Sequence, residues 1–295
     1  MKFKFLIFLL IAFAVFDLQA LDIPYELFVD GKTRVKPLYR DGSKHSPFKK
    51  IQDALNDIAD KNYPVQLLIH IAGGDYPEDL VIKKGYNRSI ALVAHQEVSV
   101  KSIGLHINGM PHFNVRSEFT LQSAMKSLVS GVFTVKESFS VYNPYGVMTH
   151  LTIQGAQIDG HIIFSTPESL ESGISPIHFI ALDSYVTGKV NPSNAKGVVL
   201  DFVDSSEFRN LVTVDAYSMV SNSVFNGLSF LTNPEVLGPV GFFNSAISGV
   251  VRGTSRGVDL YMDEYTGYWI ENNSPRTRLV NVNPIIIDSD ITVDK

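Results

Sequence analysis

Cysteine is absent from all 295 residues of the chain. Its absence excludes thiolate catalysis, cysteine-ligated zinc and disulfide bonds. A chain of this length can bury a core large enough to hold a fold without covalent cross-links. We therefore expect packing alone to stabilise it.

Long apolar runs are lacking beyond the N-terminus. The single such run, residues 5–16, follows two lysines and precedes the small residue Ala20. This order is typical of a secretory signal peptide, and a membrane anchor, the alternative, needs roughly 20 apolar residues. We expect residues 1–20 to be a signal peptide and residues 21–295 to be a secreted or periplasmic, extracellular domain. No later run is long enough to span a membrane.

A basic block, a metal motif and a linker are also lacking. The chain has 25 Lys and Arg against 30 Asp and Glu, for a net charge of −5. Such a chain is a poor candidate for nucleic acid or an anionic membrane. The histidines are scattered, and neither a helical zinc pair nor a calcium loop is present. We expect a single domain with no metal, no cofactor and no nucleic-acid partner.

One segment near the start has helical periodicity. Ser46 is suited to be an N-cap, and Pro47 follows at the first helical position. Apolar residues then recur at helical spacing on one face, at Phe48, Ile51, Ala54, Leu55 and Ile58. The spacing predicts one amphipathic helix over residues 46–60.

After the helix, the pattern changes to short strands separated by turns. Val65–Ile71, Leu80–Ile82 and Ser89–Ala94 are the first predicted strands, with turns at Gly73–Asp75 and Gly85–Arg88. Short strands without further long helices continue to the C-terminus. This pattern is typical of a sandwich, a barrel or a β-solenoid.

An internal repeat favours the solenoid. Five segments share a small or polar pair, a free position, an apolar residue, another free position, then Gly or Asn. They begin at Gly155, Asp183, Ser205, Asn222 and Asn244, with intervals of 28, 22, 17 and 22 residues. Such a period marks stacked units that bury one core. The alternative is chance recurrence of Ser/Gly turns.

The repeat predicts an all-β fold, a single-stranded right-handed parallel β-helix with coils over about 64–255. The apolar residues that would point inward and stack are Ile158, Val186, Phe208, Phe225 and Ile247. A stacked tube has two open ends whose strand edges invite pairing with other chains. The helix at 46–60 is placed to cap the N-terminal end, and residues 256–295 form a C-terminal cap or tail.

The predicted helix and first strands contain a set of recognisable stretches. They are Asp41-Gly42-Ser43, Phe48, Ile51-Gln52-Asp53-Ala54-Leu55, Val65–Ile71 and Gly74-Asp75-Tyr76-Pro77-Glu78. Together they resemble the opening of pectinesterases and of related pectin-lyase-like β-helix proteins. The resemblance covers roughly residues 41–94 and implies a β-helix whose first helix caps the coils.

The catalytic motifs of pectinesterases are not matched. The nearest echoes of their Asp-Phe-Ile-Phe-Gly strand are Asp201–Asp204 and Asp159–Phe164, and neither follows a convincing Gln-Asp pair. Trp269 follows Gly-Tyr and not Gly-Arg-Pro. Galacturonase-type signatures are absent too, so no catalytic residue is carried over. A strand would place Asp201 and Asp204 on opposite faces.

The repeat register predicts three outward columns of side chains, with neighbouring coils about 4.8 Å apart. The columns are Gln157, Tyr185, Glu207, Val224 and Ala246; Asp159, Thr187, Arg209, Asn226 and Ser248; and His161, Lys189, Leu211, Leu228 and Val250. Asp159 and Glu207 are candidate acid/base carboxylates for glycoside hydrolysis. Arg209 or Lys189 is suited to hold a uronate carboxylate. An ordinary solvated face is the alternative.

Candidate site residues follow from these columns. The catalytic candidates are Asp159, Glu207 and Arg209, and the ligand-binding candidates are His161, Tyr185, Lys189, Tyr265, Tyr268 and Trp269. With Tyr261, the last three form an aromatic group that either offers a platform for sugar rings or plugs the far end of the tube.

Three functional hypotheses remain open, because fold-level analogy alone does not fix function. The leading one is an exported β-helix protein that recognises a polysaccharide or surface glycan as a non-catalytic pectinesterase relative. An alternative is a divergent carbohydrate-active enzyme of the pectinesterase, polysaccharide lyase or glycoside hydrolase type. A further alternative is a structural or adhesive surface protein.

Overall fold

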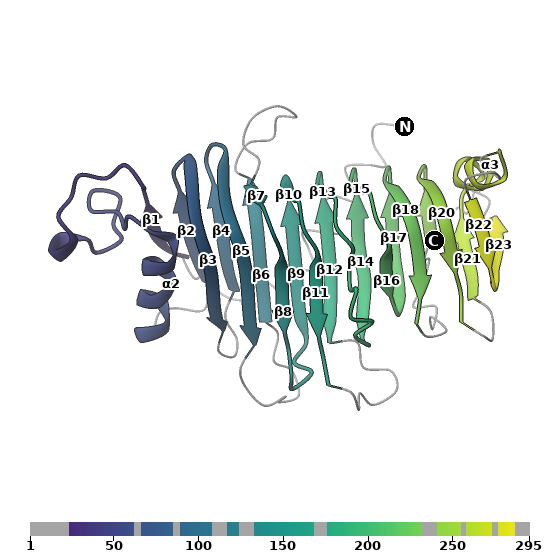
Figure 1. Cartoon of the computed structure of the whole chain (residues 1–295), viewed down its shortest axis with the longest axis horizontal. Helices are drawn as coiled ribbons and strands as arrows, with labels where there is room; N and C mark the ends of the chain where they lie inside the picture. Colours follow the sequence, from purple (N-terminus) through teal and green to yellow (C-terminus); the bar gives the residue numbers. More distant parts are fainter. Residues whose placement is uncertain are drawn as a thin grey trace, which may run out of the picture.

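The fold consists mostly of β-strands in two long parallel sheets (Figure 1). The structure is a computed structural model. It describes residues 24–61, 66–84, 89–107, 117–123, 133–167, 176–231, 241–254, 258–272 and 277–286. The predicted signal peptide, residues 1–20, lies outside the described residues. Within the described part of the chain, no helix is long and apolar enough to cross a membrane.

The first sheet has eleven strands, which all pair in parallel. In spatial order they are β1 (Tyr25–Val29), β2 (Gln66–Ile71), β4 (Ser89–Ala94), β6 (Ser117–Ser123), β9 (Thr149–Gln154), β12 (Ile177–Leu182), β14 (Val198–Asp204), β17 (Ala216–Ser221), β19 (Gly241–Phe243), β21 (Val258–Met262) and β23 (Val282–Ile286). This spatial order follows the chain order throughout.

The second sheet has twelve strands, also parallel. They are β3 (Gly74–Lys84), β5 (Val98–Ile107), β7 (Phe133–Val135), β8 (Phe139–Tyr142), β10 (Ala156–Ile158), β11 (Ile162–Ser165), β13 (Tyr185–Val186), β15 (Glu207–Phe208), β16 (Val212–Val214), β18 (Val224–Phe230), β20 (Ala246–Arg252) and β22 (Thr277–Val280). The chain passes repeatedly from one sheet to the other and back, and it adds strands to both sheets as it goes. The sheets continue beyond residue 255, as far as Ile286.

The core lies between the two sheets and runs along them as one cluster. Alternate residues of each strand point into it, as the period of two in a strand requires. Phenylalanines fill much of it, and Phe208 and Phe225 stack with their ring centroids 4.8 Å apart. Phe179 meets Phe208 edge-on at 6.4 Å. Side chains from successive strands thus replace the cross-links that the sequence lacks.

The predicted helix forms, but it is shorter than expected. Helix α2 spans Ile51–Asp60, and Ser46 is not its N-cap. Phe48 instead lies in extended chain that bridges β1, where its backbone N–H donates to the Phe28 carbonyl at 2.9 Å. Pairing with the edge of the sheet therefore outcompetes the first helical turn predicted at 46–50.

Helix α2 is attached to β3 through two polar side chains. The carboxylate of Glu78 accepts the backbone N–H groups of Ile51 and Gln52 at 3.1 and 3.0 Å. Gln52 in turn accepts the N–H of Val81 at 2.8 Å and donates to its carbonyl at 3.1 Å. Glu78 thus satisfies helix N–H groups that would otherwise be left unpaired.

Several predicted boundaries are confirmed and others are wrong. Strand β4 matches its prediction, and β2 agrees over its described residues. The strand predicted at Leu80–Ile82 is longer, because β3 begins at Gly74 inside the predicted turn and continues through an irregularity after Tyr76. Strand β1 and a second helix, α3 (Glu264–Asn272), were not predicted.

The five repeats pair in the predicted register. Ile158 lies opposite Val186, and Phe208, Phe225 and Ile247 follow in the same row. All of these side chains are at most 1% exposed. The first residue of every repeat has a positive φ, between 46° and 58°. Gly, Asn and Asp tolerate this conformation, which explains four of the five residues at that position; Ser205 is the exception.

The second repeat position forms a buried hydroxyl ladder. Its members are Ser184, Ser206, Ser223, Ser245 and finally Thr266 of α3. The hydroxyl oxygen of each later member accepts the backbone N–H of the member before it, at 3.1–3.2 Å. Each serine hydroxyl also donates to the carbonyl two residues before it, and the Thr266 hydroxyl donates to the Phe242 carbonyl. The hydroxyl ladder therefore links successive turns and ends in α3.

The third predicted column is wrong at Leu228, while Val250 is exposed as expected. Leu228 pairs with Val212 and is fully buried, so it points into the core and not outward. The register between β18 and β20 shifts between Asn226 and Leu228, so that Leu228 pairs with Val251 and not with Val250. An irregularity of this kind moves later side chains to the other face of a strand.

The hydroxyl ladder predicts a stability cost at Ser206. Replacing it with alanine removes the acceptor of the buried Ser184 N–H, so Ser206→Ala should cost about 1–3 kcal/mol of unfolding free energy. Ser165→Ala, at an exposed position, should change it by about 0.5 kcal/mol or less. Urea denaturation followed by circular dichroism measures both. Equal costs in the two variants would show that the hydroxyl ladder contributes nothing.

Candidate functional site

The first two predicted columns lie on the outer face of the twelve-stranded sheet, across β10, β13, β15, β18 and β20. The register pairs Gln157 with Tyr185, Tyr185 with Glu207, and Glu207 with Val224. Their buried neighbours along each strand point inward, so these side chains point to solvent. The short strands fix the positions of these side chains because each is paired on both sides.

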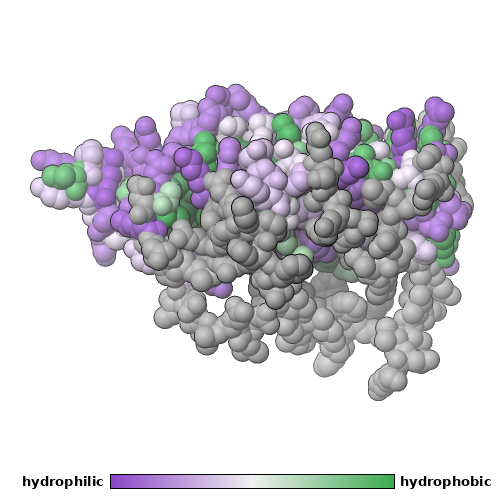
Figure 2. Space-filling model, turned by 90° about the horizontal axis from the view of Figure 1, so that it is seen from below, coloured by the Kyte–Doolittle hydropathy of each residue, from purple (hydrophilic) through white to green (hydrophobic). Residues whose placement is uncertain are grey.

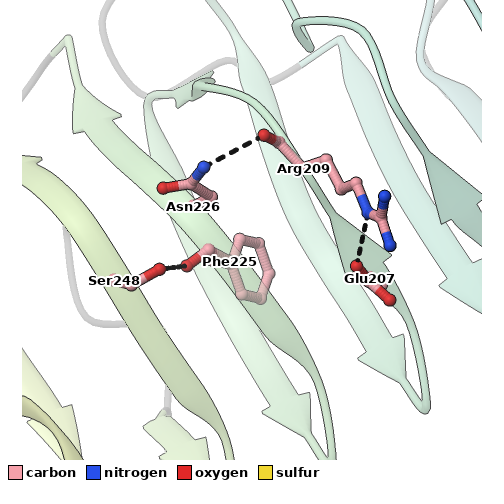
Figure 3. A network of polar contacts seen from close by, with 5 residues as sticks. All are labelled: Glu207, Arg209, Phe225, Asn226 and Ser248. Carbon is pink, nitrogen blue, oxygen red and sulfur yellow. Dashed lines mark hydrogen bonds and ion pairs between the residues drawn. The ribbon is translucent and has the colours of Figure 1, made fainter. Parts of the chain in front are cut away.

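Tyr185, Glu207 and Arg209 form the centre of the candidate site. Arg209 Nε donates to Glu207 Oε1 at 2.8 Å, two positions along the same chain segment (Figure 3). Its guanidinium carbon lies 4.9 Å from the ring centroid of Tyr185 on the neighbouring strand. The hydrogen bond to Glu207 raises the pKa of Arg209, with Tyr185 adding to it, so the guanidinium stays charged.

A shallow hollow of about 530 Å³ adjoins this centre, lined in part by Glu207, Arg209, Asn226 and Ser248. Asn226 Nδ2 donates to the Arg209 carbonyl at 3.2 Å, and the Ser248 hydroxyl donates to the Phe225 carbonyl at 3.3 Å (Figure 3). These bonds hold both side chains at the rim, where an amide oxygen and a hydroxyl oxygen are acceptors. The hollow thus combines a cation, a carboxylate and neutral polar groups.

The remaining second-column and third-column candidates, Asp159, His161 and Lys189, lie to one side of this centre. Asp159 accepts a hydrogen bond from Gln157 Nε2 at 2.6 Å. His161 Nδ1 accepts the backbone N–H of Lys189 at 2.9 Å, which leaves only Nε2 to carry a proton on the neutral ring. Asp159 follows β10 and Glu207 begins β15, which is two strand intervals or about 9.6 Å from β10, and each carboxylate has a different polar partner.

The C-terminal aromatic candidates are not part of this centre. Tyr261 is in β21, and Tyr265 is in α3, which lies at the far end of the molecule (Figure 1). The backbone of Tyr268 and Trp269 belongs to α3, but their side chains lie outside the described residues. Thr266 and Ile270 of α3 are buried.

Histidines that are scattered in the sequence stack on the outer face of the eleven-stranded sheet. The rings of His150 and His178 lie parallel within 11°, with centroids 4.9 Å apart. His178 Nδ1 lies 3.5 Å from Asp201 Oδ2. Among the described residues, no group of three or more His, Cys, Asp and Glu side chains is arranged to hold a metal ion. Sequence spacing misses this pair because stacking is set by strand pairing.

Asp201 and Asp204 are not on opposite faces, contrary to the expectation for a regular strand. Phe179 pairs with Leu200 and Ile180 with Phe202, so Asp201 is the extra residue of a β-bulge. Leu200 and Val203 are fully buried, which leaves both aspartates on the outer side. Asp204 Oδ1 accepts the Ser221 hydroxyl at 2.6 Å.

The chain matches no family model, no curated protein sequence and no solved structure. The resemblance of residues 41–94 to pectinesterases stays a prediction. Two of the stretches that carry the resemblance are in contact in the structure: Glu78 of the second accepts the N–H groups of Ile51 and Gln52 in the first.

A second histidine pair, His70 and His95, makes the stability of the fold depend on pH. His70 Nδ1 lies 2.8 Å from His95 Nε2, and the His70 ring stacks on Phe28 at 4.9 Å. Burial lowers the pKa of His70 below its ordinary 6.5, and His95 lowers it further. The folded protein therefore binds fewer protons there than the unfolded chain. The stability that the neutral His70 contributes to the fold is fully present above pH 6.5 and is lost as the pH falls below that value.

We expect the urea midpoint to be lower at pH 5 than at pH 8. His70→Gln should reduce this difference, because the glutamine does not titrate. His45→Gln, at an exposed histidine, should leave the difference as it is. An unchanged difference in His70→Gln would show that another group controls the acid sensitivity.

Proposed function

We propose that the chain is an exported right-handed parallel β-helix that binds a polysaccharide or surface glycan on the outer face of its twelve-stranded sheet. Alternation of the chain between two parallel sheets supports the β-helix, and parallel crossovers are right-handed in about 98% of cases. In this proposal α2 closes the N-terminal end and α3 the C-terminal end. The contacts of Glu78, Gln52 and Thr266 support both closures.

The observation that carries the proposal is the arrangement of Tyr185, Arg209 and Glu207. A sugar ring has apolar C–H faces and a rim of hydroxyl groups, so it is recognised by flat side chains beside polar ones. The guanidinium over the Tyr185 ring is such a flat surface, with five N–H donors. Glu207 and the adjoining Asn226 and Ser248 supply the acceptors for hydroxyl groups.

Binding is favoured over catalysis by how the carboxylates are engaged. Glu207 is paired with Arg209, and Asp159 with Gln157. A glycosidase instead needs two carboxyl groups that flank one substrate bond, one to donate a proton and the other to act as nucleophile or to activate water. The hollow is also open to solvent, whereas catalytic electrostatics gain strength where water is excluded.

The proposal is tested by capture on a panel of pectins, other uronates and neutral polysaccharides. We expect one class to bind, and Tyr185→Ala and Arg209→Gln each to weaken binding about tenfold, since each removes one stacked or charge-assisted contact. Isothermal titration calorimetry measures the affinity. Tyr142→Ala and Arg278→Gln, at exposed positions of the same sheet, serve as controls.

The same panel is assayed for released methanol or acetate, new unsaturated ends and new reducing ends. A product that is lost in Asp159→Asn or Glu207→Gln would replace the binding proposal with that of a carbohydrate-active enzyme. No capture by any polysaccharide, or capture that is unaffected by Tyr185→Ala and Arg209→Gln, would contradict the proposed site.

A further inference from the structure

A loop projects from the N-terminal end of the sheets, beyond β1 and α2 (Figure 1). It comprises residues 30–50 and carries a short 3-10 helix, η1, at Pro37–Tyr39. Leu38 is 86% exposed and Tyr39 is 65% exposed, more than any other large apolar side chain of the described residues. Figure 2 shows this end as an apolar tip bordered by hydrophilic surface. Two adjacent apolar side chains this exposed, at a projecting tip, are a candidate contact with an apolar partner.

The same loop concentrates positive charge. Residues 30–50 contain seven Lys and Arg against two Asp, a net charge of +5 in a chain whose net charge is −5. The basic residues are Lys32, Arg34, Lys36, Arg40, Lys44, Lys49 and Lys50. All of them except Arg40 are exposed, and Arg40 is partly exposed. The whole-chain charge that argued against an anionic surface therefore hides a strongly basic end.

The loop is a built structure that holds its tip outward. Its base is joined to β1 by hydrogen bonds from Phe28 N–H to the Gly42 carbonyl and from Phe48 N–H to the Phe28 carbonyl, at 2.8 and 2.9 Å. Nearer the tip, Arg40 Nε donates to the Val35 carbonyl at 2.9 Å. The N–H of Tyr39 donates to the Lys36 carbonyl at 2.9 Å and closes η1. Leu38 and Tyr39 are thus presented to solvent by an ordered backbone.

We propose that residues 30–50 form a membrane-docking loop that binds the surface of an anionic lipid bilayer. Leu38 enters the boundary between headgroups and acyl chains, and the Tyr39 ring lies at headgroup level, where amphipathic aromatic rings are favoured. Lys32, Arg34 and Lys36 contact the anionic headgroups. The long axis of the molecule then points away from the membrane, because the loop lies at one end of the sheets (Figure 1).

Charge complementarity alone would also fit another polyanion, such as nucleic acid or an acidic polysaccharide. Those partners are bound by basic and hydrogen-bonding groups and by stacking on flat rings, and they offer no hydrocarbon interior to the aliphatic side chain of Leu38. A bilayer takes up both features of the loop, since it presents anionic headgroups above hydrocarbon. The exposed apolar side chains at the tip therefore favour a membrane over another polyanion as the partner of the loop.

The test is co-sedimentation with phosphatidylcholine vesicles that contain or lack phosphatidylserine. The protein is used as recovered after export, with its N-terminus determined by mass spectrometry. We expect binding to the phosphatidylserine vesicles that weakens as sodium chloride is added. Leu38→Ser with Tyr39→Ser should weaken it at least tenfold, because two exposed side chains no longer enter the bilayer. Lys32→Gln with Arg34→Gln and Lys36→Gln should remove the preference for phosphatidylserine.

Matched controls change the same kinds of side chain elsewhere. Tyr145→Ser with Met148→Ser replaces side chains that are 49% and 42% exposed, and Lys83→Gln with Lys196→Gln and Arg278→Gln removes three exposed charges. Both controls should bind within twofold of the unchanged protein. The proposal is overturned if the phosphatidylserine vesicles bind no protein, or if the Leu38/Tyr39 variant binds them as well as the controls do. Capture by DNA or an acidic polysaccharide that needs the basic residues but not Leu38 and Tyr39, without vesicle binding, assigns the loop to that polyanion.

Discussion

Four serine hydroxyls and one threonine hydroxyl, buried at one edge of the fold, hold successive turns of the chain in register. At each of the four serine turns the first residue has a positive φ, and the N–H of the serine points along the stack toward the following turn. A hydroxyl at the following turn is the acceptor that this N–H needs, since a buried unpaired N–H is costly. Once the turns are aligned, the apolar residue two positions further on stacks in the core.

Side chains on the outer face follow from this alignment. Tyr185 and Glu207 are paired because the hydroxyl ladder and the core residues on either side of them are paired. Arg209 follows the end of β15, two residues beyond Glu207, and its guanidinium lies over Tyr185. The register of the strands therefore places the residues of the candidate glycan site, without an additional loop or domain.

Two strand pairs of the stack contain irregularities. The register between β18 and β20 shifts between Asn226 and Leu228, and Asp201 is an extra residue beside His178. Both bulges change which side chains point outward. The two ends of the stack are joined to their helices by different contacts. Glu78 and Gln52 connect α2 to β3, whereas Thr266 of α3 is the last member of the hydroxyl ladder. The basic loop at 30–50 adds a strong charge difference between one end and the rest of the molecule.

The sequence by itself determined the strand-rich fold, the register of the five repeats and the inward row from Ile158 to Ile247. These are local patterns with a fixed period, so composition and spacing suffice to read them. Tertiary structure alone decided the start of α2, the bulges at Asp201 and after Asn226, and the meeting of His150 with His178. It also decided that the basic residues of 30–50 surround an exposed apolar tip. The physical reason is that a strand's partners, and so the face of each later residue, depend on chain that is distant in sequence.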